Sequence, residues 1–144
     1  MGETGALVDT FARDHLPPRD LWPDFLLERE DFRYPARLNC ATAFLDRWVE
    51  EGRGDALAIL SPSETLTYAQ LQERVNRLAD VLVRDLGLVP GGRVLLRSAN
   101  NPMMVAAYLA VLKAGGIVVA TMPLLRAREI AYPLTKARIA IALC

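Results

Sequence analysis

The stretch LTYAQLQERVNRLADVLVRDLGL, from Leu66 to Leu88, predicts one amphipathic helix with a signal at each end. Thr67 is the expected N-cap, and Gln70, three residues later, completes a capping box. Gly87 is expected in the left-handed position that follows a helix, with Leu88 making the closing contact. Apolar side chains recur at helical spacing and predict one buried face, made by Leu71, Val75, Leu78, Ala79, Leu82 and Leu86.

A strand and a second helix follow this first helix. Residues 93–98 contain consecutive apolar side chains, which is typical of a strand that is covered on both faces. Asn101 is the expected cap of the next helix, and Pro102 suits its first position. This helix is apolar nearly all round, so we expect it to be buried on most sides until Gly115 ends it.

The strand–helix alternation continues to the last residue of the sequence. Residues 117–120 predict a strand, residues 126–137 a helix bent by Pro133, and residues 138–144 a third buried strand. This order predicts the α/β class, with a partial doubly wound parallel sheet, right-handed crossovers and flanking helices.

A further helix and a hairpin are predicted before the first helix. Asn39 is the expected cap of a helix over about 40–51, and residues 56–60 and 65–68 are expected to pair as a hairpin. The apolar face of the helix is predicted to comprise Ala41, Phe44, Leu45, Trp48 and Val49.

Residues 1–37 differ in composition from the rest of the chain. Prolines at 17, 18, 23 and 35 keep any helix in this segment short, and its aromatic side chains, at Trp22, Phe25, Phe32 and Tyr34, are available for burial. We therefore expect residues 1–37 to form an arm that lies on a larger body, and residues 38–144 to form the α/β unit.

The bulk composition excludes several classes of function. The chain has 144 residues, 17 basic and 17 acidic, without the basic patch that nucleic-acid binding requires. Cys40 and Cys144 have apolar or small neighbours, which predicts buried free thiols in a reduced compartment. The sequence does not begin with a secretory signal, so a cytoplasmic location is expected. The apolar stretch 103–125 is interrupted by Lys113 and Gly115–Gly116, which favours a buried helix and strand over a membrane span.

The hydrophobic content of 52% leaves two interpretations open. Such a fraction suits a domain that another part of the protein covers, and it equally suits an α/β core rich in Ala, Leu and Val.

The residues by themselves do not compose a complete active site. The glycine pattern at 52–54 follows a helix instead of a strand, and the KAGG at 113–116 ends a helix instead of beginning one, so neither predicts a phosphate loop. His15 has no Cys or Asp partner at useful spacing. Ser98 and Thr121 follow strands, where α/β sites gather, but the sequence offers neither a base. It also shows no carboxylate cluster for a metal.

Several short motifs, taken in order, resemble the start of the adenylate-forming acyl-CoA synthetase family. They are LTY opening a helix, NRLA within it, PGGRV leading into a strand, NP opening the next helix, and LKAGG closing it. The similarity covers about residues 38–144 and is greatest to the aryl-CoA ligase branch, which implies 2-aminobenzoate or benzoate as the acid. It further implies that this chain is the first subdomain of a large N-terminal domain.

The resemblance implies a ligase that uses Mg²⁺ and ATP to convert a small carboxylic acid into an acyl-adenylate and then transfers the acyl group to coenzyme A. The phosphate-binding loop, the ribose-binding Asp, the hinge and the C-terminal lysine of that family do not occur in these 144 residues. We therefore expect a truncated, inactive chain that binds no cofactor alone and packs against the rest of its domain, with neither nucleic acid nor membrane as partner. A homodimer is compatible with this picture.

The resemblance implies one set of site residues, near the nucleotide of coenzyme A. Thr121 and Met122 would line that site, and Arg126 or Arg128 would meet a phosphate. An ordinary strand-to-helix turn with two solvated arginines is the alternative. A standalone interaction module derived from the ligase fold, and a small nucleotide-binding α/β protein, are the alternative functions.

Overall fold

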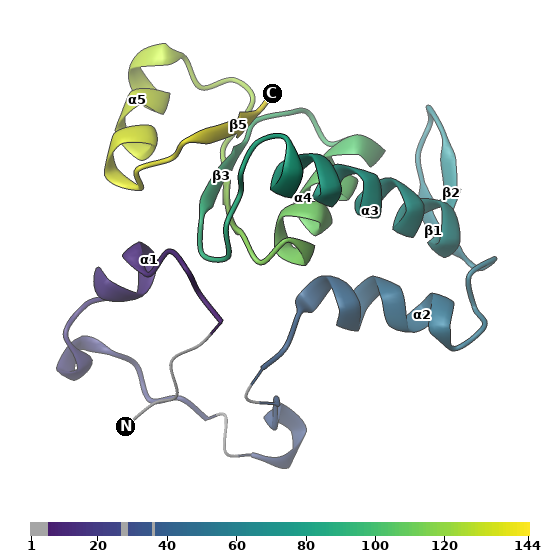
Figure 1. The fold of residues 1–144 in the computed structure, drawn as a ribbon, viewed down its shortest axis with the longest axis horizontal. Coiled ribbons are helices and arrows are strands. Elements are labelled where there is room, and N and C mark those ends of the chain that lie inside the picture. The colour runs from purple at the N-terminus through teal and green to yellow at the C-terminus, as the bar shows by residue number, and fades with distance from the viewer. Residues whose placement is uncertain (1–5, 27–28, 36) are drawn as a thin grey trace.

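The computed structural model describes residues 6–26, 29–35 and 37–144. Figure 1 shows the α/β body, with the amino-terminal arm extending from it. Its elements in chain order are α1 (Phe11–Asp14), η1 (Arg19–Leu21), η2 (Glu30–Phe32), η3 (Thr42–Asp46), α2 (Arg47–Glu50), β1 (Leu57–Leu60), β2 (Thr65–Thr67), α3 (Tyr68–Arg84), β3 (Arg93–Leu96), α4 (Pro102–Lys113), β4 (Ile117–Ala120), α5 (Ala127–Lys136) and β5 (Ile141–Leu143).

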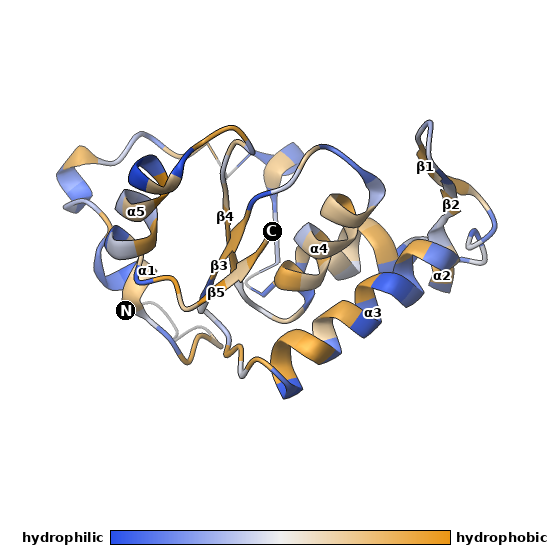
Figure 2. Ribbon diagram, turned by 90° about the horizontal axis from the view of Figure 1, so that it is seen from above, coloured by the Kyte–Doolittle hydropathy of each residue, from blue (hydrophilic) through white to orange (hydrophobic). Residues whose placement is uncertain are grey.

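The body is built around a parallel sheet with the strand order β4-β3-β5. Val94 of the central strand β3 pairs with Val118 of β4 on one side and with Ile141 of β5 on the other. Figure 2 shows α3 and α4 on one face of this sheet and α5 on the other. All four residues of β3 are buried as a result. The predicted doubly wound parallel α/β fold is confirmed, and Pro133 lies inside α5. The expected burial of the third strand and of Cys144 is wrong for this chain: Ala142 and Cys144 are exposed, because β5 is the last strand on its side of the sheet.

Helix α3 begins and ends where the sequence predicts. Gln70 N donates to Thr67 Oγ1 at 3.3 Å, and Thr67 N donates to Gln70 Oε1 at 3.0 Å, so the capping box is present. After the helix, Gly87 has a φ of +67° and Leu88 N donates to Leu82 O at 2.8 Å, which closes the last turn. The expected burial of Leu86 is wrong: this side chain is 47% exposed, because the chain has left the helical path by that residue.

The hairpin before α3 is also confirmed. Strands β1 and β2 pair in antiparallel fashion, with Leu60 opposite Thr65 and an irregularity between Leu57 and Ile59.

The helix predicted over residues 40–51 contains a wider, π-helical turn at Thr42–Asp46. Its start is as expected, since Ala41 N donates to Asn39 Oδ1 at 3.0 Å. The wide turn shifts the helical phase, so Leu45 is 1% exposed and Asp46 also faces inward. Phe44 is 69% exposed instead of packing on the buried face, and that prediction is wrong.

Helix α4 is buried along one face and open along the other. Asn101 caps it as predicted, because Met104 N donates to Asn101 Oδ1 at 2.8 Å. The buried face packs against α3 and β3 and comprises Pro102, Ala106, Ala107, Ala110 and Val111. The expectation of burial on most sides is wrong for this chain, since Met103, Val105 and Tyr108 are 50%, 42% and 43% exposed.

The first part of the arm, residues 6–15, is bound to the amino end of the sheet, and we call it the N-terminal segment. Val8 N and Asp9 N both donate to Pro90 O at 2.9 Å. Arg93 pairs with the Asp9 carboxylate, and its guanidinium lies over the ring of Phe11 at 4.8 Å. This contact ties the start of the chain to the central strand.

The later aromatic residues of the arm behave differently. Phe25 and Tyr34 are 58% and 64% exposed, so the body of this chain does not bury them as the sequence suggested. Residues 1–5, 27–28 and 36 of the arm lie outside the described residues. The division at residue 37 stays a prediction.

Candidate functional site

The three parallel strands present their carboxyl ends at one edge of the sheet. In β3, β4 and β5 these ends are Leu96, Ala120 and Leu143. The chain leaves β3 for one neighbour and later returns to the other, and ligands of open α/β sheets bind in the crevice at such a reversal. A hollow of about 90 Å³ lies there, lined by Leu96, Ser98, Met103, Met104, Ala107, Leu143 and Cys144. This carboxyl edge is therefore the candidate site.

The loop after β4, residues 121–126, lies at the same edge. Thr121 N donates to Leu96 O at 3.0 Å, so Thr121 is held at the end of the central strand. Leu125 N donates to Met122 O at 3.2 Å, which closes a tight turn. The Met122 side chain is 63% exposed and is available to a ligand. The structure thus brings Thr121 and Met122 together at the edge.

Arg126 and Arg128 occupy the start of α5. Arg126 is the residue before the helix, and its backbone N donates to Glu129 Oε2 at 2.8 Å. Both arginine side chains are exposed. The Glu129 carboxylate already places a negative charge at the helix start, which disfavours a second anion at the helix N–H groups, so an incoming anion would be bound by the guanidinium groups.

Arg97 is the residue of the edge that the sequence analysis missed. Its Nη2 donates to the carbonyl oxygens of Pro123 at 2.6 Å and Leu125 at 2.8 Å, and its backbone N donates to Leu143 O at 2.9 Å. One residue therefore connects the ends of β3 and β5 with the loop after β4. An arginine directly after an apolar strand was the available signal, but its partners lie more than twenty positions away.

Comparison with known proteins places this chain in a family. A family model described as AMP-binding enzyme matches residues 45–144. The chain belongs to the AMP-binding enzyme family. Its fold is that of the N-terminal domain of adenylate-forming ligases, as the sequence predicted.

The relatives of this AMP-binding enzyme chain include a CoA ligase and a peptide synthase by name. A 3-hydroxybenzoate–CoA/4-hydroxybenzoate–CoA ligase of Thauera aromatica is 34% identical over 95 residues, which is 66% of this chain and 18% of that protein. Tyrocidine synthase 3 of Brevibacillus parabrevis is 39% identical over 89 residues, covering 62% of this chain and 1% of that protein.

A solved structure gives the fold comparison. The crystal structure of an anthranilate CoA ligase in complex with anthranoyl-AMP has a TM-score of 0.72 and 24% identity, covering 79% of this chain and 22% of that one. At that identity the likeness shows the fold alone. The chain spans about a fifth of the length of such ligases, by the 18% and 22% coverage of the two.

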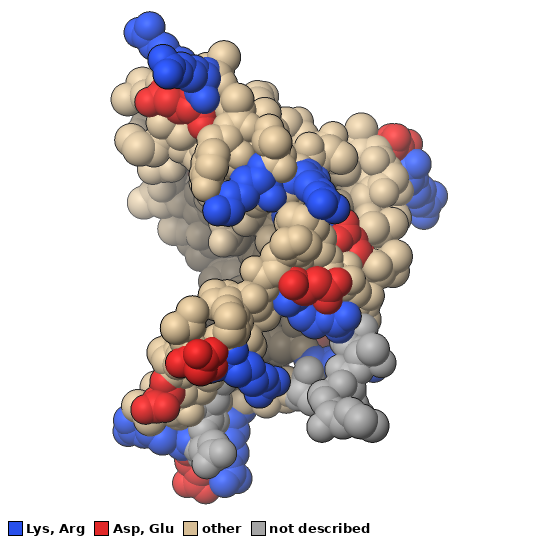
Figure 3. All heavy atoms as spheres, turned by 90° about the vertical axis from the view of Figure 1, so that its left-hand side faces the viewer, with Lys and Arg blue, Asp and Glu red and all other residues tan. Residues whose placement is uncertain are grey.

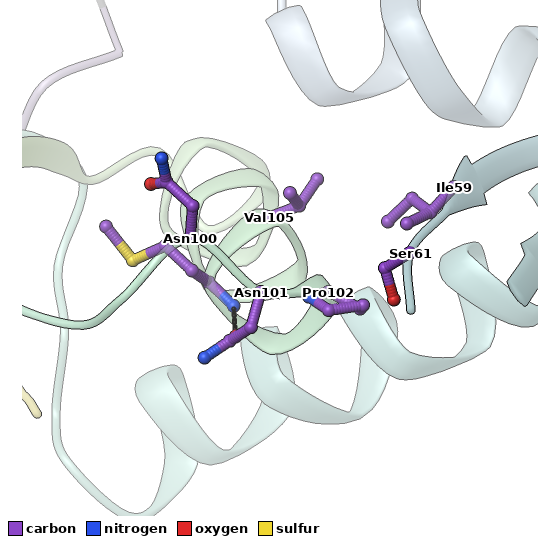
Figure 4. A pocket seen from close by; sticks show the side chains of 7 residues that line it. Ile59, Ser61, Asn100, Asn101, Pro102 and Val105 are labelled. Carbon is purple, nitrogen blue, oxygen red and sulfur yellow. Dashed lines mark hydrogen bonds between the residues drawn. The ribbon is translucent and has the colours of Figure 1, made fainter. Parts of the chain in front are cut away.

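A second hollow of the AMP-binding enzyme chain lies beside the start of α4, with a volume of about 240 Å³ (Figure 4). Its lining is mostly apolar and comprises Ile59, Ser61, Asn100, Asn101, Pro102, Met104 and Val105. The fold already uses two of its polar groups: Asn101 caps α4, and Ser61 Oγ donates to Glu64 O at 2.8 Å. This hollow therefore offers little directed chemistry.

A part-buried ion pair lies away from the edge, between Asp46 and Lys113. Burial raises the pKa of the Asp46 carboxyl, but hydrogen bonds from Lys113 Nζ at 2.7 Å and Gln72 Nε2 at 2.9 Å lower it by more. The net pKa of Asp46 therefore lies below its ordinary value. A carboxylate held charged in this way joins three helices and is poorly suited to accept a proton.

Charge and metal ligands add no second site in the part of the chain that the structure describes. Figure 3 shows basic and acidic side chains side by side on one face, without a continuous basic patch. Within residues 6–26, 29–35 and 37–144, no three His, Cys, Asp or Glu side chains are grouped to hold a metal ion. None of the helices in these ranges combines the length and the apolar character that a bilayer crossing requires.

Proposed function

We propose that this chain is the amino-terminal part of an ATP-dependent acid–CoA ligase that activates an aromatic acid such as 2-aminobenzoate or benzoate. The match of residues 45–144 to the AMP-binding enzyme family carries the proposal. The 34% identity to a hydroxybenzoate–CoA ligase supports the aromatic class.

The proposed reaction has two steps. A carboxylate oxygen of the acid attacks the α-phosphorus of ATP, an O–P bond forms, and diphosphate leaves with Mg²⁺. The thiol sulfur of coenzyme A then attacks the acyl carbon of the adenylate, an S–C bond forms, and AMP leaves with the bonding electrons. The thiol proton passes to solvent or to a base.

Residues of the carboxyl edge would serve the second step. Thr121 and Met122 lie on the exposed loop after β4 and would line the nucleotide of coenzyme A. Arg126 or Arg128 would bind one of its phosphates, because a guanidinium forms paired hydrogen bonds to phosphate oxygens. Both side chains are exposed at the start of α5, where a phosphate can reach them.

The remaining machinery would be supplied by a further part of the protein. Its apolar side chains would cover Met103, Val105 and Tyr108, the open face of α4. We infer that the 144 residues alone do not activate an acid, since the groups that bind the phosphates of ATP would come from that part. A cytoplasmic location suits a ligase with these soluble substrates.

Acid-dependent exchange between ATP and labelled diphosphate tests the first step. The full-length protein that carries this chain should exchange with 2-aminobenzoate, benzoate or a hydroxybenzoate, and the 144-residue chain alone should not. Exchange by the short chain would defeat the proposal that the ATP site lies elsewhere. A full-length protein that folds and exchanges with none of these acids would favour the interaction module.

Two variants test the second step. Arg126→Gln and Arg128→Gln should raise the KM for coenzyme A by roughly tenfold for the arginine that binds the phosphate, the effect expected when a hydrogen bond to a charged group is lost. Diphosphate exchange should stay within about twofold of the unaltered protein. Arg84→Gln is the matched control, because that arginine is 77% exposed on α3.

A further inference from the structure

Thr121, at the start of the loop after β4, is held by the bond from its backbone N to Leu96 O. The turn that follows, residues 122–125, depends among the described residues on one side chain for its long-range support. Its own short-range bond, from Leu125 N to Met122 O, closes the turn but does not attach it to the sheet. Arg97 Nη2 makes that attachment through the carbonyl oxygens of Pro123 and Leu125, at 2.6 and 2.8 Å. These two carbonyls therefore face the guanidinium of Arg97, the residue that follows β3.

The position of these two carbonyls bears on which side chains of the loop are exposed. Met122 is 63% exposed and Leu124 is 80% exposed, so the side chains point away from the sheet while the backbone is held against it. Arg126 ends the loop and is the residue before α5. The direction in which Met122 and Arg126 face the edge is thus a consequence of where Arg97 places the loop.

Arginine is suited to this task for two reasons. Its planar guanidinium can donate to two carbonyls at once, and it is more weakly hydrated than an ammonium group, so its partial burial costs less. The Nε atom of Arg97 is buried and has no acceptor among the described residues. An unpaired buried donor is unfavourable, so the side chain is held in place by its contacts at Nη2 and not by optimal pairing of all its donors.

We propose that Arg97 is a positioning residue that orients the loop of residues 121–126 for binding of coenzyme A. This inference rests on the proposed function. Arg97 acts through the loop and does not touch the ligand. Its loss is therefore predicted to impair the coenzyme A step selectively, with the adenylation step preserved.

Kinetics of three variants of the full-length protein test the effect on the site. Arg97→Met should raise the KM for coenzyme A by roughly tenfold, as for the loss of a charged hydrogen bond, while diphosphate exchange stays within about twofold. Arg97→Lys should be intermediate, because an ammonium can still donate to one carbonyl. Arg77→Met, an exposed arginine of α3 with 79% of its side chain accessible, is the control. Equal behaviour of Arg97→Met and Arg77→Met would overturn the proposal, as would a parallel fall of both steps.

Hydrogen exchange of the same variants separates this proposal from the proposed function. Arg97→Met should increase backbone exchange in peptides that cover residues 121–126 by roughly tenfold and leave those of α3 unchanged, since loss of one anchor opens the loop locally. Unchanged exchange in the loop would overturn the positioning role. If the unaltered protein forms no acyl-CoA, the proposed function fails, and the exchange result alone decides whether Arg97 orients the loop.

Discussion

Substitution of Gly91 by alanine is predicted to detach the N-terminal segment from the sheet. A Cβ at Gly91 would lie 2.0 Å from the backbone oxygen of Asp9, which is far below any van der Waals contact. The segment would have to move by more than about 1 Å to reach an ordinary contact distance. Such a shift breaks the bonds from Val8 N and Asp9 N to Pro90 O, both 2.9 Å long.

The magnitude follows from two contributions. Gly91 has a φ of +89°, and this conformation costs an alanine about 1 kcal/mol. Two lost backbone hydrogen bonds contribute about 1 kcal/mol each, so the free energy of unfolding should fall by about 3 kcal/mol. Gly52→Ala is the matched control, because Gly52 has a φ of +77° and a Cβ there would meet nothing within 4 Å. It should lose only about 1 kcal/mol.

Urea denaturation, followed by circular dichroism, measures both variants against the unaltered chain. The difference of about 2 kcal/mol between them reports the attachment of the N-terminal segment alone, since the backbone strain is common to both. If Gly91→Ala and Gly52→Ala are equal within about 0.5 kcal/mol, the segment is not held over Gly91 and the reasoning is refuted.

Two further predictions concern the wide turn of η3. Ionised Asp46 contributes stability above the unfolded pKa of about 3.9, and this contribution is lost as the pH falls through its lower folded value, so Asp46→Asn should flatten the acid limb of stability against pH. Denaturation between about pH 2 and pH 7 measures this, with Asp80→Asn, from an exposed pair, as the control that should keep the limb. Phe44→Ala should change the unfolding free energy by less than about 0.5 kcal/mol, whereas Leu45→Ala should cost about 2–5 kcal/mol, because the side chains are 69% and 1% exposed. Thermal unfolding measures both alanine variants. A larger loss of stability for Phe44→Ala than for Leu45→Ala would contradict the helical phase described above.

Helices with local end signals were predictable from the sequence, because the residues that make each signal lie close together in the chain. The cap of α3 depends on Thr67 and Gln70, and the cap of α4 on Asn101, all within one turn of the helix start. The periodic apolar residues of α3 likewise predict a buried face, which packs mainly against α4. Such signals do not require knowledge of distant residues.

The wide turn at Thr42–Asp46 was not predictable, because the residues that Asp46 contacts lie far away in the sequence. Asp46 reaches Lys113 of α4 and Gln72 of α3, partners 67 and 26 positions away. An ordinary α-helix would bury Phe44 with Leu45, as the spacing suggested. The wider turn instead turns Asp46 inward, where the ion pair joins three helices, and leaves Phe44 outside.

The residues of the candidate site also include some that the sequence analysis named and one that it missed. Thr121, Met122, Arg126 and Arg128 came from a resemblance, and the structure gathers them in one loop and helix start without testing their roles. Arg97 could not be found from local pattern, because its partners, Pro123 and Leu125, are set by the pairing of β3 with β4.

Arg93 and Arg97 perform parallel tasks at opposite ends of the central strand. At the amino end, Arg93 donates to the carbonyl oxygens of Ala137 and Arg138, at 2.8 and 3.1 Å, and pairs with Asp9. At the carboxyl end, Arg97 donates to two carbonyls of the loop after β4. Strand β3 therefore holds the loops of both edges as well as both neighbouring strands. Only the carboxyl edge faces the crevice where ligands bind in this class of sheet. Loss of Arg93 should therefore lower the free energy of unfolding, and loss of Arg97 should weaken the binding of coenzyme A.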